Sequence, residues 1–258
     1  DWQKIIEKLS VEYDGKIIVA GTHSEGQSLS FKSDKIVNLC GRTKIVDLPS
    51  ILKAAQFLVA ADSLLVQISN LTNTPVINLT FSGVRFWETG PRTLGSRIIE
   101  FKSPDHVLPP LVISAVKKVI TKSPPESNEW CVIHDSGVLY EKKGEPRDFS
   151  WELIRAIYMG ADFPLATDLK VVQAFEQIYS LSGLVVQQIE ALLRRPNNQE
   201  SMMLLNQSES LIDQVGELVP EVSPLVRWLK TEKLRLGPGD MVTVAKQTIE
   251  IYEKMKLI

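Results

Sequence analysis

The sequence is poor in the residues that build disulfide and metal sites. It contains two cysteines and three histidines among 258 residues, and these side chains are scattered along the chain. Cys40 and Cys131 each lie in an apolar, strand-like run, which favours two buried thiols in a reducing compartment over a disulfide framework. None of these residues has the spacing of a metal-binding motif, so we expect no metal site.

Long apolar segments and an excess of basic residues are also lacking. No run of about 20 apolar residues occurs, and the first residues do not resemble a signal peptide, which predicts a cytoplasmic chain without a transmembrane segment. The formal net charge is −2, which argues against nucleic acid as a partner. No G-x-G-x-x-G follows a predicted strand, which argues against a dinucleotide-dependent redox enzyme.

The first half of the sequence alternates short apolar runs with amphipathic segments. The runs predict strands at 16–20, 36–39, 57–60, 76–79 and 97–101. Apolar strands that alternate with helices predict an α/β domain over residues 1–121, with a parallel sheet covered on both faces. Such a domain normally opens on a strand, whereas this chain opens on an amphipathic helix that contains Trp2. We therefore expect a further segment upstream.

The second half has a different pattern. Residues 122–165 predict a linker at 122–128, a β-hairpin around Asp135-Ser136-Gly137, and a short helix that Ser150 caps and Gly160 ends. Residues 166–258 predict an antiparallel helical bundle with seams of alternating four- and three-residue steps. Two helices of this bundle carry the clearest seams: Val171, Phe175, Ile178, Ser182, Val185, Ile189 and Leu192, then Leu204, Ser208, Leu211, Val215 and Leu218. Packing explains these seams, and partner binding or self-association is the alternative, because polar residues interrupt them.

A turn at Asp62-Ser63 is the first candidate site. Residues 54–81 read as a buried strand, this turn, a helix that begins near Leu64, and a second buried strand. A helix start at the carboxyl end of parallel strands presents unpaired backbone N–H groups and a partial positive charge, and can hold a diphosphate. The Ser63 hydroxyl would then bind phosphate, while Asp62 fixes the turn or binds a sugar hydroxyl. The alternative is that Asp62 or Ser63 is an ordinary helix N-cap.

The order of the motifs over residues 1 to about 121 resembles glycosyltransferase family 9, the heptosyltransferase family. The resemblance lies in VNLCGRT at 37–43, a helix from Leu48, the A-D-S of 61–63 and the T-P-V-I of 74–77. The loop at 21–25, F-S-G at 81–83, R-F-W at 85–87 and G-P at 90–91 also look like family segments. The resemblance implies a Rossmann-like domain, the C-terminal half of a GT-B fold, to which the helical bundle is an addition.

The resemblance also implies an activity. Family members transfer a sugar, with inversion and without a metal, from a nucleotide-diphospho-sugar, often ADP-heptose, to a lipopolysaccharide-core acceptor. The lipid- or saccharide-type acceptor and the catalytic base would belong mainly to a missing upstream domain. We therefore name no catalytic residue and expect this chain alone to be inactive. A cytoplasmic location, peripheral at the inner membrane, follows from such an acceptor.

Positions matching the family motif give the candidate donor site. The resemblance assigns the diphosphate and sugar to Asp62, Ser63 and the Leu64 backbone, places Gln67 where the family has a His, and assigns Glu25 to the ribose and Gly41 and Thr43 to the base side. The sequence departs from the family at Leu64 and Asn73, where the family has Gly, and at Gln67. The departures at Leu64 and Gln67 favour an alternative, a non-catalytic glycosyltransferase-like scaffold whose bundle mediates partner binding or self-association.

Overall fold

The computed structural model describes residues 2–124, 129–135, 138–143 and 148–258. The chain divides into two compact units, Asp1–Glu145 and Pro146–Ile258. The predicted boundaries at 121/122 and 165/166 differ from this division. The predicted linker lies largely outside the described residues, and so does most of the hairpin turn.

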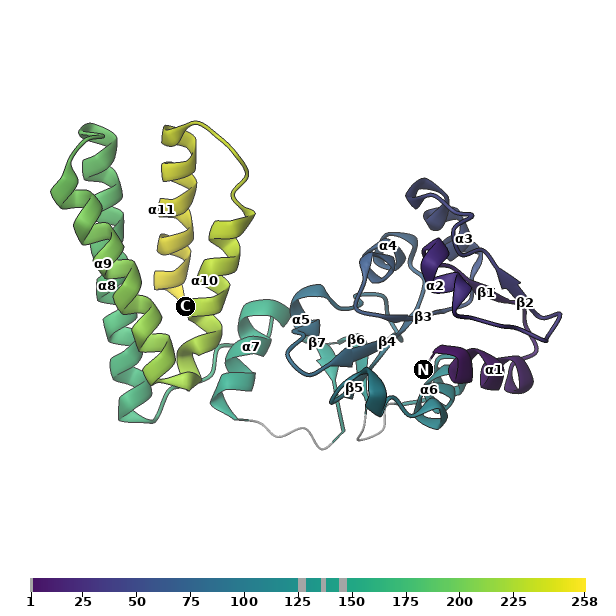
Figure 1. Ribbon diagram of the computed structural model, residues 1–258. Coiled ribbons are helices and arrows are strands. Elements are labelled where there is room, and N and C mark those ends of the chain that lie inside the picture. Colours follow the sequence, from purple (N-terminus) through teal and green to yellow (C-terminus); the bar gives the residue numbers. More distant parts are fainter. Residues whose placement is uncertain (1, 125–128, 136–137, 144–147) are drawn as a thin grey trace. The chain divides into compact units, whose positions relative to one another are not determined.

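The first unit contains both helices and strands (Figure 1). Its helices are α1 (Trp2–Glu12), α2 (His23–Gln27), α3 (Leu48–Ala54), α4 (Leu64–Thr72), α5 (Phe86–Thr89) and α6 (Pro109–Thr121), with 3-10 turns η1 (Ile45–Asp47) and η2 (Pro104–His106). Its strands are β1 (Ile17–Val19), β2 (Ile36–Asn38), β3 (Leu58–Ala61), β4 (Val76–Phe81), β5 (Arg97–Phe101), β6 (Trp130–Asp135) and β7 (Val138–Glu141). The predicted strands therefore all exist, with ends shifted by at most two residues.

The strands form two sheets instead of one. A five-stranded sheet has the order β3-β4-β5-β6-β7, and β1 and β2 form a separate parallel pair. Strands β3, β4 and β5 are parallel, but β6 and β7 are antiparallel. The α/β class is confirmed, and the strands predicted within residues 1–121 pair in parallel, but they do not form one sheet, and the predicted hairpin makes the larger sheet mixed. The outer edge of β5 offers unpaired backbone groups, and the hairpin that was assigned to a separate segment pairs with them.

The β1–β2 pair also departs from the prediction of a sheet covered on both faces. Ile18 and Val37 face each other in the register of this pair, and both side chains are exposed. Only this face is open, because Ile17, on the other face of β1, packs against the core that α1 and α6 cover. The expectation of full cover holds only for the central strands, where Val76, Ile77 and Ile98 are completely buried.

Successive side chains of β4 point to opposite faces of the larger sheet. Ile77 and Leu79 pack in a core with α1 and α6, while Val76 packs with Val66 of α4 on the other face. Figure 1 shows α1 and α6 on one side of the central strands and α4 on the other. Asn78 shares the face of Val76, so the polar residues of this strand point toward the α4 side.

The second unit is helical and comprises α7 (Phe149–Met159), α8 (Leu169–Arg194), α9 (Gln199–Leu218), η3 (Pro220–Val222), α10 (Ser223–Arg235) and α11 (Met241–Leu257). Helix α8 packs against α9 and α11, and α10 packs against the same two helices. The chain direction alternates along these four helices (Figure 1). They form an antiparallel four-helix bundle, and α7 packs against α10.

Helix caps follow the sequence closely, with one correction. Asp168 and Asp240 cap α8 and α11, since each side chain accepts hydrogen bonds from the first turn of its helix. Gly160 ends α7 with a left-handed φ of 79°. The cap of α7 is Asp148, which accepts from the Trp151 N–H at 2.7 Å, and not Ser150. Ser150 lies within the first turn of α7, which begins at Phe149, so Asp148 holds the N-cap position.

Most residues of the predicted α8 seam are buried, whereas three of the five residues predicted for the α9 seam are exposed. Val171, Ile178, Ser182, Val185 and Ile189 of α8 are buried. On α9 the buried residues are Ser201, Ser208, Ile212, Val215 and Gly216, while Leu204, Leu211 and Leu218 are exposed. Gly216 lets α10 approach closely, since a Cβ there would lie 3.0 Å from Val226 Cγ2. That approach turns α9 toward α10 and leaves the leucines outside.

Candidate functional site

The Asp62-Ser63 turn joins β3 to α4 without the ordinary capping bond. Ser63 is the N-cap residue by position, with φ −161° and ψ 170°, but within the described chain its side chain makes no capping hydrogen bond. Asp62 does not cap α4 either, because its Oδ1 accepts from Asn78 Nδ2 at 2.9 Å. The first turn of α4 therefore keeps backbone N–H groups that neither side chain satisfies.

A buried polar cluster lies beneath this turn. It consists of Asp62, Asn78 and Thr80 and is called the Asp62 cluster below. Asn78 and Thr80 have exposed fractions of 0% and 1%. Ala60 pairs with Asn78 in the β3–β4 register, so Asp62, two residues later, is level with Thr80.

Three atoms of the Asp62 cluster are buried and have no hydrogen-bond partner among the described residues: Asp62 Oδ2, Asn78 Oδ1 and Thr80 Oγ1. An unsatisfied buried polar group costs about 1–3 kcal/mol, so three of them together are not explained by stability. Sequence reasoning missed Asn78 and Thr80. The available signal was two polar residues at alternate positions of an otherwise apolar strand.

Leu64 and Gln67 lie on α4 next to the turn. Leu64 begins the helix, and its side chain is exposed. Gln67 Nε2 donates to the carbonyl oxygen of Thr89, at the end of α5. Asn70 adds to this contact, since its Oδ1 accepts from the Arg92 N–H at 2.7 Å. Gln67 thus helps to attach α4 to the segment that follows α5.

Asn73 ends α4 in the left-handed conformation, with φ 54° and ψ 35°. This is one of the few conformations in which Asn replaces Gly at low cost. Asn at this position therefore keeps a local backbone that Gly would also adopt. Leu64 has no positive φ, so its backbone does not require glycine, and its side chain is exposed.

Glu25 lies at the start of α2, after β1. Its Oε2 accepts from the Thr22 backbone N–H at 2.6 Å and from Thr22 Oγ1 at 2.7 Å, which forms a capping box. These hydrogen bonds stabilise the carboxylate and lower the pKa of Glu25. The carboxylate is oriented by its own turn, and its exposed position leaves its remaining lone pairs accessible to a hydroxyl group.

Gly41 packs against this turn at the end of β2. Its N–H donates to the Gly21 carbonyl oxygen at 2.9 Å, which joins the two loops. Gly41 has φ +71°, and a Cβ there would lie 2.9 Å from His23 Cβ. Both the backbone and the close approach therefore require glycine. Thr43 follows two residues later and is half-buried.

The candidate residues thus form two groups, each at the carboxyl ends of a parallel strand pair. Glu25 and Gly41 lie together after β1 and β2, while Asp62, Ser63 and Leu64 lie together after β3. The second group combines N–H donors at a helix start, which suit an anion, with buried acceptors, which suit hydroxyl groups. Within the described ranges, no three His, Cys, Asp or Glu side chains lie together as a metal site requires.

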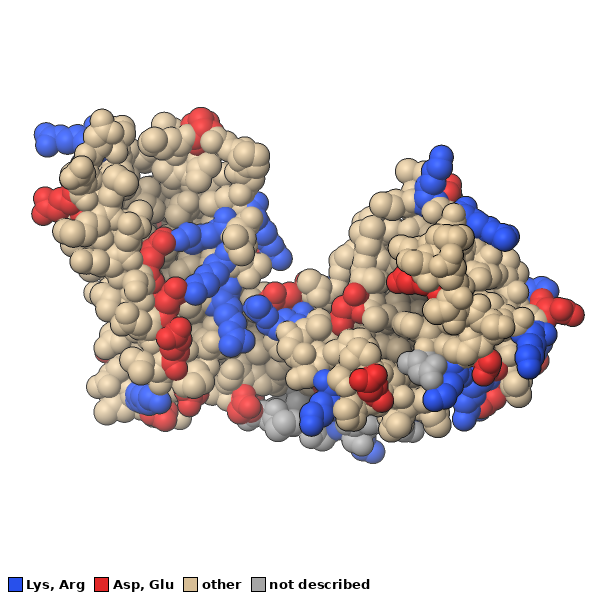
Figure 2. Space-filling model, viewed as in Figure 1, with Lys and Arg blue, Asp and Glu red and all other residues tan. Residues whose placement is uncertain are grey.

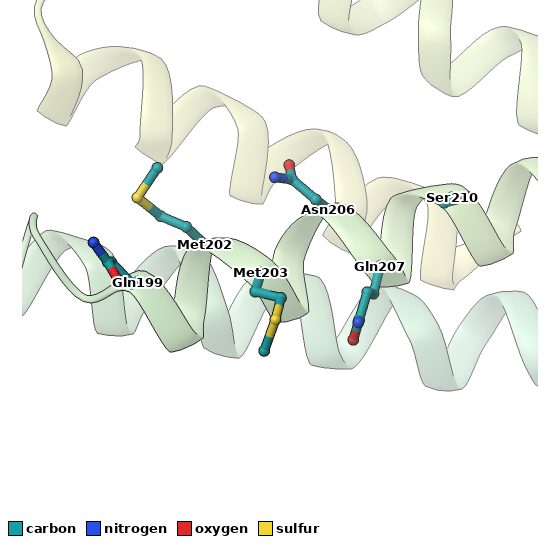
Figure 3. Close-up of a pocket in the computed structure, with 6 residues that line it drawn as sticks. All are labelled: Gln199, Met202, Met203, Asn206, Gln207 and Ser210. Carbon is teal, nitrogen blue, oxygen red and sulfur yellow. The ribbon is translucent and has the colours of Figure 1, made fainter.

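A separate hollow lies on α9 in the second unit (Figure 3). It is lined by Gln199, Met202, Met203, Asn206, Gln207 and Ser210. All of these come from one helix, and none is an acid, a base or a reactive nucleophile at neutral pH. We therefore place no catalytic chemistry there and regard the Asp62 turn as the better candidate for a ligand site.

The helices were also compared with membrane spans, and the chain with known proteins. No helix in the described parts of the chain is long and apolar enough to cross a membrane. The resemblance to glycosyltransferase family 9 rests on the ordered motifs of residues 1 to about 121 alone. Comparisons with models of known protein families, with curated proteins and with solved structures found no match to this chain.

Proposed function

We propose that the first unit is the nucleotide-sugar-binding half of a family-9-like glycosyltransferase. In this proposal its sheet and helices are the Rossmann-like, C-terminal half of a GT-B fold. The reaction is inverting, metal-independent sugar transfer from a nucleotide-diphospho-sugar, such as ADP-heptose, to a saccharide-type acceptor held mainly by another domain. The observation that supports the proposal most is the uncapped start of α4 beside the buried Asp62 cluster.

In this proposal the hydrogen-bond donors of the site and its hydrogen-bond acceptors contact different parts of the ligand. Backbone N–H groups at the start of α4 and the Ser63 hydroxyl donate hydrogen bonds, so they face the diphosphate. A carboxylate repels a diphosphate, so Asp62 accepts from a sugar hydroxyl, and Asn78 supports it through their 2.9 Å hydrogen bond. Glu25 is the corresponding acceptor for the ribose hydroxyls.

The helix start also has a role in the transfer itself. The bond between the sugar C1 and the diphosphate oxygen breaks while the acceptor oxygen bonds to C1, and the acceptor proton passes to a base of the acceptor-binding domain. Negative charge grows on the leaving nucleoside diphosphate in that step. The partial positive charge at the start of α4 stabilises it.

A non-catalytic scaffold is the second candidate, and Leu64 is the observation that favours it. A Cβ at this position obstructs the close approach of a phosphate to the backbone of the first turn. Gln67 is also engaged with the Thr89 carbonyl oxygen. In a scaffold descended from the enzyme, the Asp62 cluster would remain while the phosphate site had been lost.

Thermal unfolding with ADP, UDP and their sugar conjugates tests the two candidates. If the site binds, a ligand at about 100 times its dissociation constant adds roughly 2.7 kcal/mol to the free energy of unfolding. We expect Asp62→Ala to abolish this stabilisation and the exposed-site control Asp34→Ala to retain it. Leu64→Gly restores the family residue and should strengthen binding. No stabilisation at millimolar ligand, in the parent chain and in Leu64→Gly alike, would reject the donor site and support the scaffold.

A further inference from the structure

Helix α9 has two seams with the spacing of interhelical contacts, on different faces. The inner seam runs through Ser201, Leu205, Ser208, Ile212, Val215 and Val219 and packs into the bundle core. The outer seam runs through Leu204, Gln207, Leu211, Gln214 and Leu218, in steps of 3, 4, 3 and 4 residues. All five residues of the outer seam are exposed. The exposed fractions of its leucines are 39%, 46% and 73%.

The outer seam also lacks charged side chains over most of its length. Between Ser201 and Gly216 the charged residues of α9 are Glu209 and Asp213. Both pair with α10: Lys233 Nζ donates to Glu209, and Lys230 Nζ lies 2.9 Å from Asp213 Oδ1. Figure 2 shows acidic and basic side chains in facing rows between α9 and α10, and a mostly uncharged surface over the first half of α9. A helix face that remains in water normally carries charged residues, so this one is unusual.

The residues on either side of the first half of the outer seam are also uncharged. Met203 and Gln207 project to one side of α9, and Met202 and Asn206 to the other (Figure 3). Met203 is exposed and lies next to Leu204, so an adaptable apolar side chain flanks the start of the seam.

We propose that the outer seam binds the outer seam of a second copy of the chain, with the two α9 helices antiparallel. Alternating steps of three and four residues are the spacing that two helices need to pack along their length. The order Leu-Gln-Leu-Gln-Leu reads the same in both directions around Leu211. A surface that matches itself under a twofold rotation is what a symmetric dimer requires.

Charge selects the antiparallel arrangement. Glu200 lies four residues before Leu204 and is therefore the next position of the outer seam. Parallel helices in register would place Glu200 against Glu200 of the second copy, which is unfavourable. Antiparallel helices centred on Leu211 place Leu204 opposite Leu218 of the second copy, leave Glu200 beyond the last residue of the second α9, and bring the uncharged centres together. The 20 residues of α9 span about 30 Å, which suits a small interface with a dissociation constant on the order of micromolar.

Sedimentation equilibrium of the full chain tests the interface. From about 1 to several hundred micromolar we expect a change from one chain of 28.9 kDa to two. Leu211→Lys should raise the dissociation constant at least tenfold. Leu234→Lys, at a site that is 86% exposed on α10, should leave it unchanged. Circular dichroism must show the same helix content in all three proteins. A mass of one chain throughout, or a dimer unaffected by Leu211→Lys, would overturn the proposal.

Engineered cysteines test the orientation, because Cys40 and Cys131 are both buried. With copper phenanthroline as the oxidant, Leu211→Cys should cross-link to its own copy, since it lies near the twofold axis. Leu204→Cys alone should not cross-link, but a mixture of Leu204→Cys and Leu218→Cys should. Efficient cross-linking of Leu204→Cys to itself would show parallel helices and overturn the proposed arrangement. This result is independent of nucleotide-sugar binding, so the interface and the donor site can fail separately.

Discussion

Replacing Asp62 by Asn separates the stability of the strand-to-helix turn from its proposed ligand role. Oδ1 of Asp62 accepts from Asn78 Nδ2 at 2.9 Å, and Oδ2 is buried without a partner among the described residues. Asp62→Asn keeps the acceptor for Asn78. It also replaces the unsatisfied oxygen by an N–H donor, which a small rotation can direct to Asn78 Oδ1.

The expected losses and gains in the free energy of unfolding nearly cancel for Asp62→Asn but not for Asp62→Ala. Loss of the charge on one hydrogen bond costs about 1 kcal/mol, and removal of a buried, unpaired carboxylate oxygen returns a similar amount. We therefore expect Asp62→Asn to change the free energy of unfolding by less than about 1 kcal/mol. Asp62→Ala leaves both ends of the Asn78 amide buried and unpaired, and should cost about 2–3 kcal/mol. Ligand stabilisation should be lost in both variants, because neither keeps the carboxylate.

Urea unfolding followed by tryptophan fluorescence measures these differences, with the transition of the first unit analysed separately. A double-mutant cycle with Asn78→Ala isolates the hydrogen bond and should give a coupling of about 1.5–3 kcal/mol. A coupling below about 0.5 kcal/mol would show that the bond does not stabilise the fold. If Asp62→Asn were as destabilising as Asp62→Ala, the charge itself, and not the hydrogen bond to Asn78, would hold the turn.

Two further predictions concern the rest of the first unit. Lys118→Met should destabilise it by on the order of 3 kcal/mol, because Lys118 Nζ lies 2.9 Å from Glu129 Oε1 with side-chain exposures of 12% and 3%. The control Lys117→Met breaks an exposed pair with Glu12 at 2.7 Å and should cost less than about 1 kcal/mol in the same urea experiment; equal costs would contradict the prediction. Burial raises the pKa of Tyr140 to about 12, above its ordinary value of 10.0, so the stability that depends on the neutral phenol is complete below pH 10 and is lost as the pH rises toward 12. Tyr140→Phe should reduce the loss of unfolding free energy between pH 10 and 12 by roughly 2–3 kcal/mol, and an unchanged pH profile would show that the pKa of Tyr140 is the same in the folded and unfolded states.

The features that sequence predicted best are those that neighbouring residues determine. The strand 97–101 is confirmed at both ends, and the strand 36–39 begins at the predicted residue. Gly160 ends α7 because its own φ requires glycine. Each of these depends on the preferences of a few adjacent residues, and sequence contains those directly.

The errors occur where distant segments meet. The hairpin 130–141 was predicted as a hairpin, but its pairing with β5 depends on which sheet edge is free. The seam of α9 could be drawn through Leu204 and Leu211 or through Leu205 and Ile212, because both sets fit a helical period. The close contact of Gly216 with Val226 decides between them, and no pattern within α9 contains it.

The candidate site depends both on adjacent residues and on a contact between distant segments. The turn at Asp62 was visible in the sequence because a strand, a polar pair and a helix start are consecutive. Its partner Asn78 lies 16 residues away and is brought to it by the β3–β4 register. Yet β4 has Asn78 and Thr80 at alternate positions of a buried strand, on the face toward α4. Polar residues are costly there, and a protein keeps them at positions where function outweighs stability. Two polar residues on one face of an apolar strand are thus stronger evidence for a ligand site than the Asp-Ser turn, since a turn of that kind begins many helices that bind nothing.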